Sequence, residues 1–419
     1  MNAETETPLP DHKPAFLKRV RIRGYKSIAF CDVTLEPLTI LVGHNASGKS
    51  NFVEALSFLR DVLNRGLGFA VREHQGIKAI LNRCTNDREI RFDLECSLPD
   101  TRGVYKTAHY HLTIAAESHN TLRTISEQFS VNGDATTGYE RPQGFTIANA
   151  TGMYDLEGFE HRNLTSIPDH RKAMLAQLIA SLRTIVGYNF IPSAYRRPLS
   201  KDNGGFLEHD ALNITSVVQS IMDNSPKTMN RINRYLRRIA QTVQFSRVQP
   251  VGGYEVLVFN IATSPDAAPI EFDASAMSDG TLRAFASLVA AFQTIPEEGS
   301  PSFVAIEEPE TSLHPAAMHA LVDALDEATL RTQILITTHS ADLLDCSTIK
   351  PENVRVVQMI DGFTWIGPID EVGKEIIARK LCSLGDLERQ NQLNIDEDDL
   401  ARQREEYTKH EVKPEAVPA

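Results

Sequence analysis

The stretch GHNASGKS, residues 43–50, fits the phosphate-loop pattern GxxxxGK[ST]. An apolar run, Leu38–Val42, precedes it, and a helical pattern, Phe52–Leu59, follows it. The arrangement predicts a strand, a tight glycine turn and a helix N-terminus, which together direct backbone N–H groups and a helix dipole at one anion. We therefore expect a polyphosphate site in which Lys49 reaches the β- and γ-phosphates and Ser50 ligates Mg²⁺.

A second apolar run, Ser302–Ile306, ends in the acidic pair Glu307 and Glu308. Ligands of parallel sheets collect at the carboxyl ends of the strands, so we expect this pair beside the phosphate loop. Glu307 can then hold the Mg²⁺ shell, and Glu308 can orient or deprotonate a water. The alternative interpretation is that the acidic pair is only a solvated strand end. The nearby carboxylate of Glu310 argues against this interpretation.

Two further segments carry polar residues suited to phosphate. Ser278 precedes the apolar helical run Leu282–Phe292 and, with Gly280, predicts a second anion-binding helix N-terminus, although alone it is only a helix cap. A third apolar run, Gln333–Thr338, ends in His339. A histidine at that edge can donate to a γ-phosphate, whereas a lone histidine there is more often a structural hydrogen-bonding residue.

The order of these four motifs resembles that of ABC-type ATPase heads, and in particular of OLD- and RecF-like members, including small stand-alone OLD-like and Septu-like phage-defence ATPases. The segments that carry the resemblance are MSDGTLR at 277–283, AIEEPETSLHP at 305–315, the opening strand at 17–28 and the closing segment at 381–387. The resemblance covers roughly residues 16 to 390. It implies an α/β P-loop NTPase with an ABC-ATPase-like head, built from a mixed sheet, an antiparallel β subdomain and a helical insert.

The resemblance also implies ATP and Mg²⁺ as cofactors, and a homodimer or higher homo-oligomer in which Ser278 and Gly280 of one subunit close over ATP bound to another. It assigns Lys49, Glu308 and His339 to catalysis, and Ser50 and Glu307 to the metal. The residues expected to bind nucleotide are Gly43, Asn45, Ser47, Gly48, Lys49, Ser50, Asn51, Ser278 and Gly280.

The chain departs from the family pattern at three of these motifs. In the phosphate loop, His44 and Ala46 replace the commoner proline and glycine, at positions that the general pattern leaves open. Glu307 is one methylene longer than the usual aspartate, so we expect its contact with Mg²⁺ to run through water. Asp279 replaces a glycine and brings a negative charge near the γ-phosphate pocket. We expect this charge either to point away from the pocket or to be neutralised, with Arg283, one turn later, as the candidate partner. The sequence does not decide which residue is the Q-loop glutamine of the family, and Gln75 and Gln128 are the two candidates.

We expect five parts: a disordered leader at 1–15, a first lobe with the phosphate loop at 16–160, a helical lid or arm at 161–250, a second lobe with the remaining motifs at 251–385, and a charged, partly disordered tail at 386–419. The clearest helices of the insert are expected at 170–184 and 226–242. Neither sustains heptads, which argues against a long SMC-type arm.

The composition, with 42% hydrophobic and 23% charged residues, is that of a globular protein. No run of about eighteen apolar residues is present, so we expect no membrane span. Five scattered cysteines indicate reduced thiols and a cytoplasmic location. The net charge of −12 argues against a wholly basic nucleic-acid-binding protein. Arginines along residues 227–238 are nevertheless either a solvated helix face or a nucleic-acid contact.

The leading hypothesis is an ATPase that dimerises around ATP and regulates a separate effector, a nuclease or toxin, in bacterial antiphage defence. The effector is placed on a separate protein because no Toprim-like acidic cluster follows the head. The alternative is a RecF-like DNA-binding ATPase in repair or recombination. A transporter subunit is disfavoured, because the sequence SDGT at 278–281 departs from the LSGGQ signature of that class.

Overall fold

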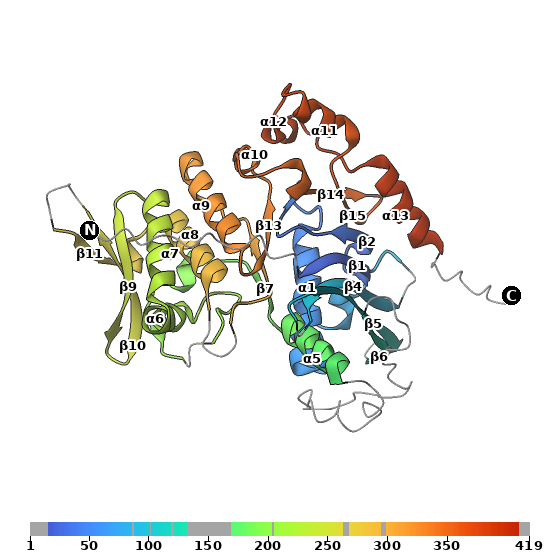
Figure 1. Cartoon of the computed structure of the whole chain (residues 1–419), viewed down its shortest axis with the longest axis horizontal. Helices are drawn as coiled ribbons and strands as arrows, with labels where there is room; N and C mark the ends of the chain where they lie inside the picture. The colour runs from blue at the N-terminus through green and yellow to red at the C-terminus, as the bar shows by residue number, and fades with distance from the viewer. Residues whose placement is uncertain are drawn as a thin grey trace.

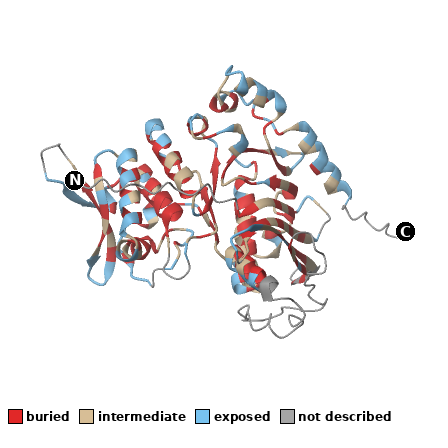
Figure 2. Cartoon of the chain, viewed as in Figure 1, coloured by how far each residue is buried: buried red, intermediate tan, exposed pale blue. Residues whose placement is uncertain are grey.

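The computed structural model of the chain describes residues 16–85, 88–100, 102–118, 121–131, 169–202, 205–262, 268–294 and 299–409. The expected leader at 1–15 and the last ten residues of the tail lie outside this part. Figure 1 shows two lobes on either side of a central sheet. Buried residues concentrate in the sheets and in the helix faces that cover them (Figure 2).

The central sheet has six strands in the order β15-β14-β3-β13-β12-β7, and all of them are parallel except β15. Their bounds are β3 Leu38–Val42, β7 Ile185–Tyr188, β12 Phe303–Glu307, β13 Gln333–Thr338, β14 Val354–Ile360 and β15 Phe363–Gly367. The strands β3, β12 and β13 read as continuous apolar runs because both faces of a parallel sheet are covered. Together with the antiparallel sheet described next, this confirms the expected fold class.

The strand register brings the predicted motifs to one edge of this sheet. Thr338 pairs with Val42, the last residue before the phosphate loop, and Thr337 pairs with Glu307. The acidic pair is therefore not on the strand next to β3, because β13 lies between them. All three strands nevertheless end on the same side, as expected for ligand-binding edges of open α/β sheets.

The antiparallel sheet has the order β2-β1-β4-β5-β6. The inward residues Phe92 and Leu94 are buried and alternate with Asp93 and Glu95, as the polar and apolar alternation predicts. The buried face packs on α1, whose Phe58 is fully buried. The bounds are β1 Leu17–Tyr25, β2 Ile28–Thr34, β4 Glu89–Pro99, β5 Tyr105–Ser118, β6 Thr121–Val131, α1 Lys49–Arg65, α2 Leu67–Glu73 and α3 Ile77–Ile80.

The other lobe contains a sheet of order β11-β10-β8, with β9 also paired to β10, and four helices that pack on one another, two of them also against β9. The helices are α6 Ile214–Asn224, α7 Pro226–Ile239, α8 Asp279–Phe292 and α9 Pro315–Ala328. The strands are β8 Leu199–Ser200, β9 Val243–Val251, β10 Tyr254–Ile261 and β11 Ile270–Asp273, and short 3-10 turns lie at Pro192–Ala194 and Ala274–Ala276. A third such turn, Pro351–Asn353, lies against β3 of the central sheet.

The segment expected as one helical insert at 161–250 is divided between the two lobes. Helix α5, Asp169–Arg183, packs on α1 through the buried Leu178 and Leu182, and β7 then joins the central sheet. Helices α6 and α7 instead join the core of the second lobe, where Ile232 is fully buried. The apolar faces of these helices decide the division, because each is covered by a different set of neighbours.

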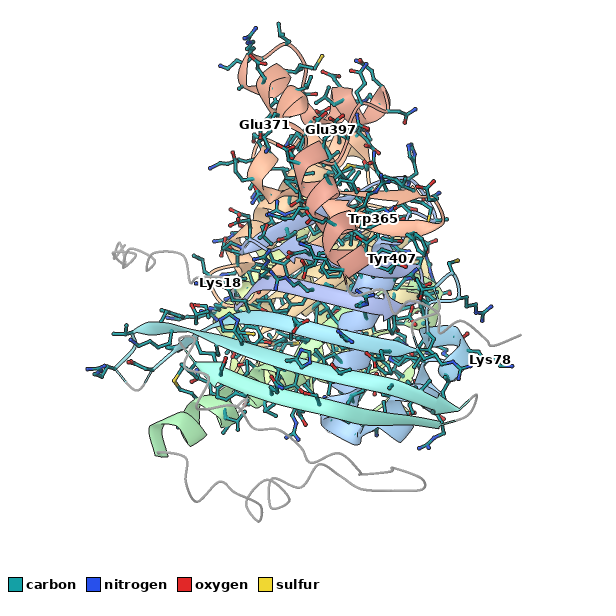
Figure 3. All side chains as sticks on the ribbon, turned by 90° about the vertical axis from the view of Figure 1, so that its right-hand side faces the viewer. Lys18, Lys78, Trp365, Glu371, Glu397 and Tyr407 are labelled. Atoms are coloured by element: carbon teal, nitrogen blue, oxygen red, sulfur yellow. The ribbon has the colours of Figure 1, made fainter. Side chains whose placement is uncertain are left out.

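The chain returns at its C-terminus across the first lobe in α10 Ala341–Leu344, α11 Glu371–Ala378, α12 Leu384–Arg389 and α13 Glu397–Lys409. The tail, expected to be partly disordered, thus contains the helix α13, which extends to Lys409. Gln403 on α13 donates to the carbonyl of Ile366 at 2.9 Å and accepts from the backbone N–H of Asp32 at 3.2 Å. Tyr407 lies beside Trp365 of β15, with 6.5 Å between ring centroids (Figure 3).

Within the described ranges, no helix is both long and apolar enough to cross a membrane. The five cysteines are free thiols, and Cys31, Cys96 and Cys346 are buried.

Candidate nucleotide-binding site

The phosphate loop connects β3 to α1, and β15 contacts it through Thr364. Gly48 has a φ of 105° and lies so close to Thr364 that a Cβ at this position would overlap the threonine hydroxyl. Thr364 donates to the carbonyl of Ser47 at 2.8 Å, and its hydroxyl lies 2.7 Å from that of Ser27. Asn51, expected to bind nucleotide, donates to the Ser27 hydroxyl at 2.6 Å. Glycine is therefore required at position 48 both by conformation and by this close approach.

The Lys49 side chain curls back over the loop. Its ammonium donates to the carbonyl oxygens of Gly43 at 2.6 Å and His44 at 2.9 Å, and only 7% of the residue is exposed. Burial lowers the pKa of Lys49, and nearby carboxylates, Glu308 first, oppose this shift. The two carbonyls are neutral acceptors, so phosphate oxygens can replace them with stronger, charge-assisted hydrogen bonds.

The first acid of the pair reaches the loop across β13. The Ser50 hydroxyl donates to a carboxylate oxygen of Glu307, so the two residues expected to hold the metal are in contact. Burial raises the pKa of Glu307, the Ser50 hydrogen bond lowers it, and the charge of Glu308 raises it further. A divalent cation between this hydroxyl and this carboxylate would relieve that unfavourable burial of charge.

The second acid is paired with the switch histidine. His339 Nδ1 lies 3.1 Å from a carboxylate oxygen of Glu308, and both side chains are partly exposed. Glu308 has a φ of 44°, a left-handed conformation that a non-glycine residue adopts at a cost. Its backbone N–H donates to the carbonyl of Thr337 at 2.9 Å, which holds it at the end of β12. The acid and the histidine therefore lie side by side at the carboxyl edge of the sheet.

A third carboxylate, Glu310, lies beneath this pair. It is 4% exposed, and one of its oxygens accepts a hydrogen bond from the Thr338 hydroxyl. The other oxygen has no hydrogen-bond partner in the described part of the chain, and burial raises the pKa of the group. Thr338 in turn accepts from the backbone N–H of Ser340 at 2.9 Å. Glu310 therefore links the turn after the acidic pair to the residues on either side of His339.

The signature residues lie at the start of α8. The Ser278 hydroxyl caps the helix by accepting from the backbone N–H of Thr281 at 3.2 Å. Gly280 packs on the carbonyl of Ser312, where a Cβ would overlap. Among the described residues, no hydrogen bond or ion pair joins Ser278 or Gly280 to the phosphate loop of the same chain. Hydrogen bonds thus join Ser50 to Glu307 and His339 to Glu308, whereas the signature contacts the turn after the acidic pair through Gly280 and Ser312.

The expected neutralisation of Asp279 by Arg283 is wrong. The structure pairs Asp279 with Arg196, at 2.5 Å, and the same guanidinium donates to the carbonyl of Ser275 at 2.9 Å. Arg196 follows the 3-10 turn Pro192–Ala194, 83 residues earlier in the chain, so no local pattern pointed to it.

Three other residues singled out from the sequence lie apart from these contacts. Asn45 is exposed on the loop. Gln75 follows α2 with a φ of 66°, and Gln128 lies on β6, where it lines a cavity on the outer face of the antiparallel sheet. These positions give no reason to assign either glutamine to the nucleotide-binding site.

The residues present fit ATP and Mg²⁺. The Ser47 hydroxyl is buried without a hydrogen-bond partner in the part of the chain that is described, which leaves a donor for a phosphate oxygen. Lys49 would bind the phosphates, while Ser50 and Glu307 would hold Mg²⁺. The metal, when bound, neutralises phosphate charge.

Comparison with known proteins agrees with this arrangement. Residues 16–190 match the family described as "AAA ATPase domain", and residues 179–345 match "AAA domain, putative AbiEii toxin, Type IV TA system". The Old nuclease of Escherichia phage P2 is 23% identical over 348 residues, and the match covers 78% of this chain and 57% of the relative. The OLD nuclease of Thermus scotoductus is 24% identical over 356 residues, covering 82% of this chain and 62% of the relative. In these matches the chain is similar to OLD-like ATPases of the ABC and AAA type.

The ATPase thus spans about 57% and 62% of the length of these two curated relatives. Its fold is similar to that of a solved Smc head domain derived from Pyrococcus furiosus, with a TM-score of 0.53 and 13% identity, covering 87% of this chain and 99% of that chain. At that identity the likeness shows the fold, and it confirms the expected ABC-like head.

Proposed function

We propose that the ATPase forms a homodimer around two ATP molecules, with the phosphate loop of each subunit facing Ser278 and Gly280 of the other. The observation that carries this proposal is the position of Ser278. It caps the N-terminus of a 14-residue helix, an anion-binding element, and its side chain is exposed, yet nothing in the described part of its own chain joins it to Lys49.

In this dimer ATP binding would close the two subunits together and hydrolysis would release them. Glu308 would accept the proton of the attacking water, since its carboxylate stands at the strand edge beside His339. His339, which now contacts Glu308, would turn its ring N–H to the γ-phosphate. Lys49 would hold the phosphates in place, and Ser50 with Glu307 would orient the metal.

Subunit mixing tests the composite site. Ser278→Arg should block closure while ATP binding by the monomer remains nearly unchanged, because the phosphate loop is intact. Mixing this variant with Lys49→Ala subunits should restore one complete site per heterodimer, and ATP hydrolysis should reappear. The measurement is the ATPase rate of each variant alone and of the mixture.

Ser278→Ala is the matched control for this experiment. If Ser278 merely caps its own helix, alanine and arginine should both cost about 1 kcal/mol of stability, and the mixture should recover no activity. Failure to complement in folded, mixed dimers would argue against the composite site.

We further propose that this cytoplasmic ATPase regulates a separate nuclease in antiphage defence. The names of the two curated relatives, both called nucleases, support this proposal. Expressing the ATPase with and without the product of a neighbouring nuclease gene should show protection from phage only for the pair. Protection by the ATPase alone would contradict a separate effector.

The RecF-like alternative receives less support from the structure. Arg231 and Arg234 of α7 pair with Glu327 of α9 at 2.9 and 3.1 Å, and Arg238 pairs with Asp323 of α9 at 2.6 Å. These contacts engage three of the guanidinium groups on α7, whereas the exposed Arg237 and Lys227 take no part in them. ATP-dependent binding of duplex DNA, without any nuclease partner, would favour the alternative.

A further inference from the structure

An arginine from outside the four motifs lies at the start of the signature helix α8. The Arg196 guanidinium donates to a carboxylate oxygen of Asp279 at 2.5 Å and to the carbonyl of Ser275 at 2.9 Å. Asp279 is the first residue of α8 and directly follows Ser278, which caps the helix. Arg196 therefore joins the turn that precedes the signature helix to the first residue of that helix.

The neighbouring residue in the sequence fixes the position of Arg196. Tyr195 is buried, and its hydroxyl lies 3.5 Å from the carbonyl oxygen of Leu282, near the start of α8. The 3-10 turn Pro192–Ala194 also packs on α8. Because the backbone on this side of Arg196 is held against the helix, the guanidinium is kept at the same end of α8 as Ser278.

Asp279 brings a negative charge to the end of α8 that otherwise attracts anions. The N-terminus of a helix carries a partial positive charge, which favours carboxylates and phosphates alike. The Asp279 side chain is 62% exposed, so its charge faces any anion that approaches this end of the helix. Like charges repel each other, and a cation beside one of them cancels most of the repulsion. The Arg196–Asp279 pair has no net charge and thus leaves the start of α8 suited to a phosphate.

We propose that Arg196 is a positioning residue for ATP hydrolysis, which neutralises Asp279 so that the start of α8 can approach the γ-phosphate of ATP bound to the partner subunit. The inference rests on the proposed dimer, because only a second subunit brings a phosphate loop to this helix. Arg196 acts through Asp279 and not on the reacting atoms. The alternative is an ion pair that only stabilises the fold, which partly exposed ion pairs do weakly.

A double-mutant cycle measures the charge compensation. In Arg196→Ala, the uncompensated Asp279 should lower the rate of ATP hydrolysis by roughly tenfold or more. Adding Asp279→Asn to this variant should return the rate to near the wild-type value, because the amide carries no charge and the two positions are coupled. The defect of Arg196→Ala should also shrink at high salt, which screens the repulsion. The Kd for ATP, measured in the Ser278→Arg background, in which the dimer does not close, should be the same with and without Arg196→Ala.

Subunit mixing separates failure of this inference from failure of the dimer proposal. A mixture of Arg196→Ala and Lys49→Ala subunits should hydrolyse ATP faster than either variant alone, since the Lys49→Ala subunit supplies an intact Arg196 to the working phosphate loop. If Ser278→Arg complements Lys49→Ala but Arg196→Ala does not, the dimer stands and the role of Arg196 is overturned. If neither mixture recovers activity, the dimer proposal fails and the inference fails with it.

Two further variants serve as controls. Arg247→Ala removes a similarly exposed ion pair of the same lobe, in which Arg247 meets Glu271 at 2.8 Å, and it should leave hydrolysis unchanged. Arg196→Lys keeps the positive charge and should retain most of the wild-type rate. A wild-type rate in Arg196→Ala would overturn the proposal. A double variant as slow as Arg196→Ala would also overturn it, since Arg196 would then act by stabilising the fold or by touching phosphate directly.

Discussion

Replacing Lys49 with alanine should abolish tight ATP binding and, with it, hydrolysis. The ammonium is held over the loop by the carbonyls of Gly43 and His44, where phosphate oxygens can take their place. Loss of two charge-assisted hydrogen bonds should weaken binding by about 10²-fold or more. Isothermal titration with ATP measures the change directly.

Lys374→Ala is the control for this variant. Lys374 pairs with Glu371 on the surface of α11, so its loss removes one positive charge without touching the phosphate loop. It should bind ATP as the wild type does. A Lys49→Ala protein that is folded and still binds ATP with wild-type affinity would contradict the assignment of the loop.

Replacing Glu308 with glutamine should preserve ATP binding and slow hydrolysis by about 10²–10⁴-fold. The amide keeps the shape of the side chain and its place beside His339, but it cannot accept the proton of the attacking water. If the dimer proposal holds, ATP should then trap the closed state. Single-turnover hydrolysis measures the rate, and size-exclusion chromatography with ATP detects the trapped dimer.

The neighbouring acid provides the sharper comparison. Glu307→Gln disturbs the contact with Ser50 and should impair Mg²⁺-dependent binding more than the proton transfer itself. Glu371→Gln, on a side chain that is 80% exposed, should leave turnover unchanged. If Glu307→Gln stalls turnover while Glu308→Gln leaves it intact, the two roles are reversed.

Local pattern was sufficient for the elements that carry the motifs. The apolar run before residues 43–50 predicted β3, and the runs ending at Glu307 and Thr338 predicted β12 and β13. Buried parallel strands need apolar residues on both faces, and a phosphate loop needs glycines at set spacing. Each of these requirements concerns only a few neighbouring residues, so it can be recognised in the sequence. The ATPase class and the ABC-like head followed from the order of the motifs.

Contacts between distant segments were decided by the tertiary structure alone. Ser50 meets Glu307 across 257 residues, and Ser27 meets Thr364 across 337. The partner of Asp279 proved to be Arg196 instead of the nearer Arg283 because the fold, and not helical spacing, sets which guanidinium lies at the start of α8.

The sequence by itself therefore determined which residue types stand at the carboxyl edge of the sheet, since each motif is a short stretch with its own periodicity and turn chemistry. Only the tertiary structure decided which side chains pair there. The tail illustrates the difference: its charge suggested a partly disordered segment, yet α13 docks through Gln403 and Tyr407. A few contacts with strands more than thirty residues away offset the entropy of ordering the helix, and no local pattern reports such contacts.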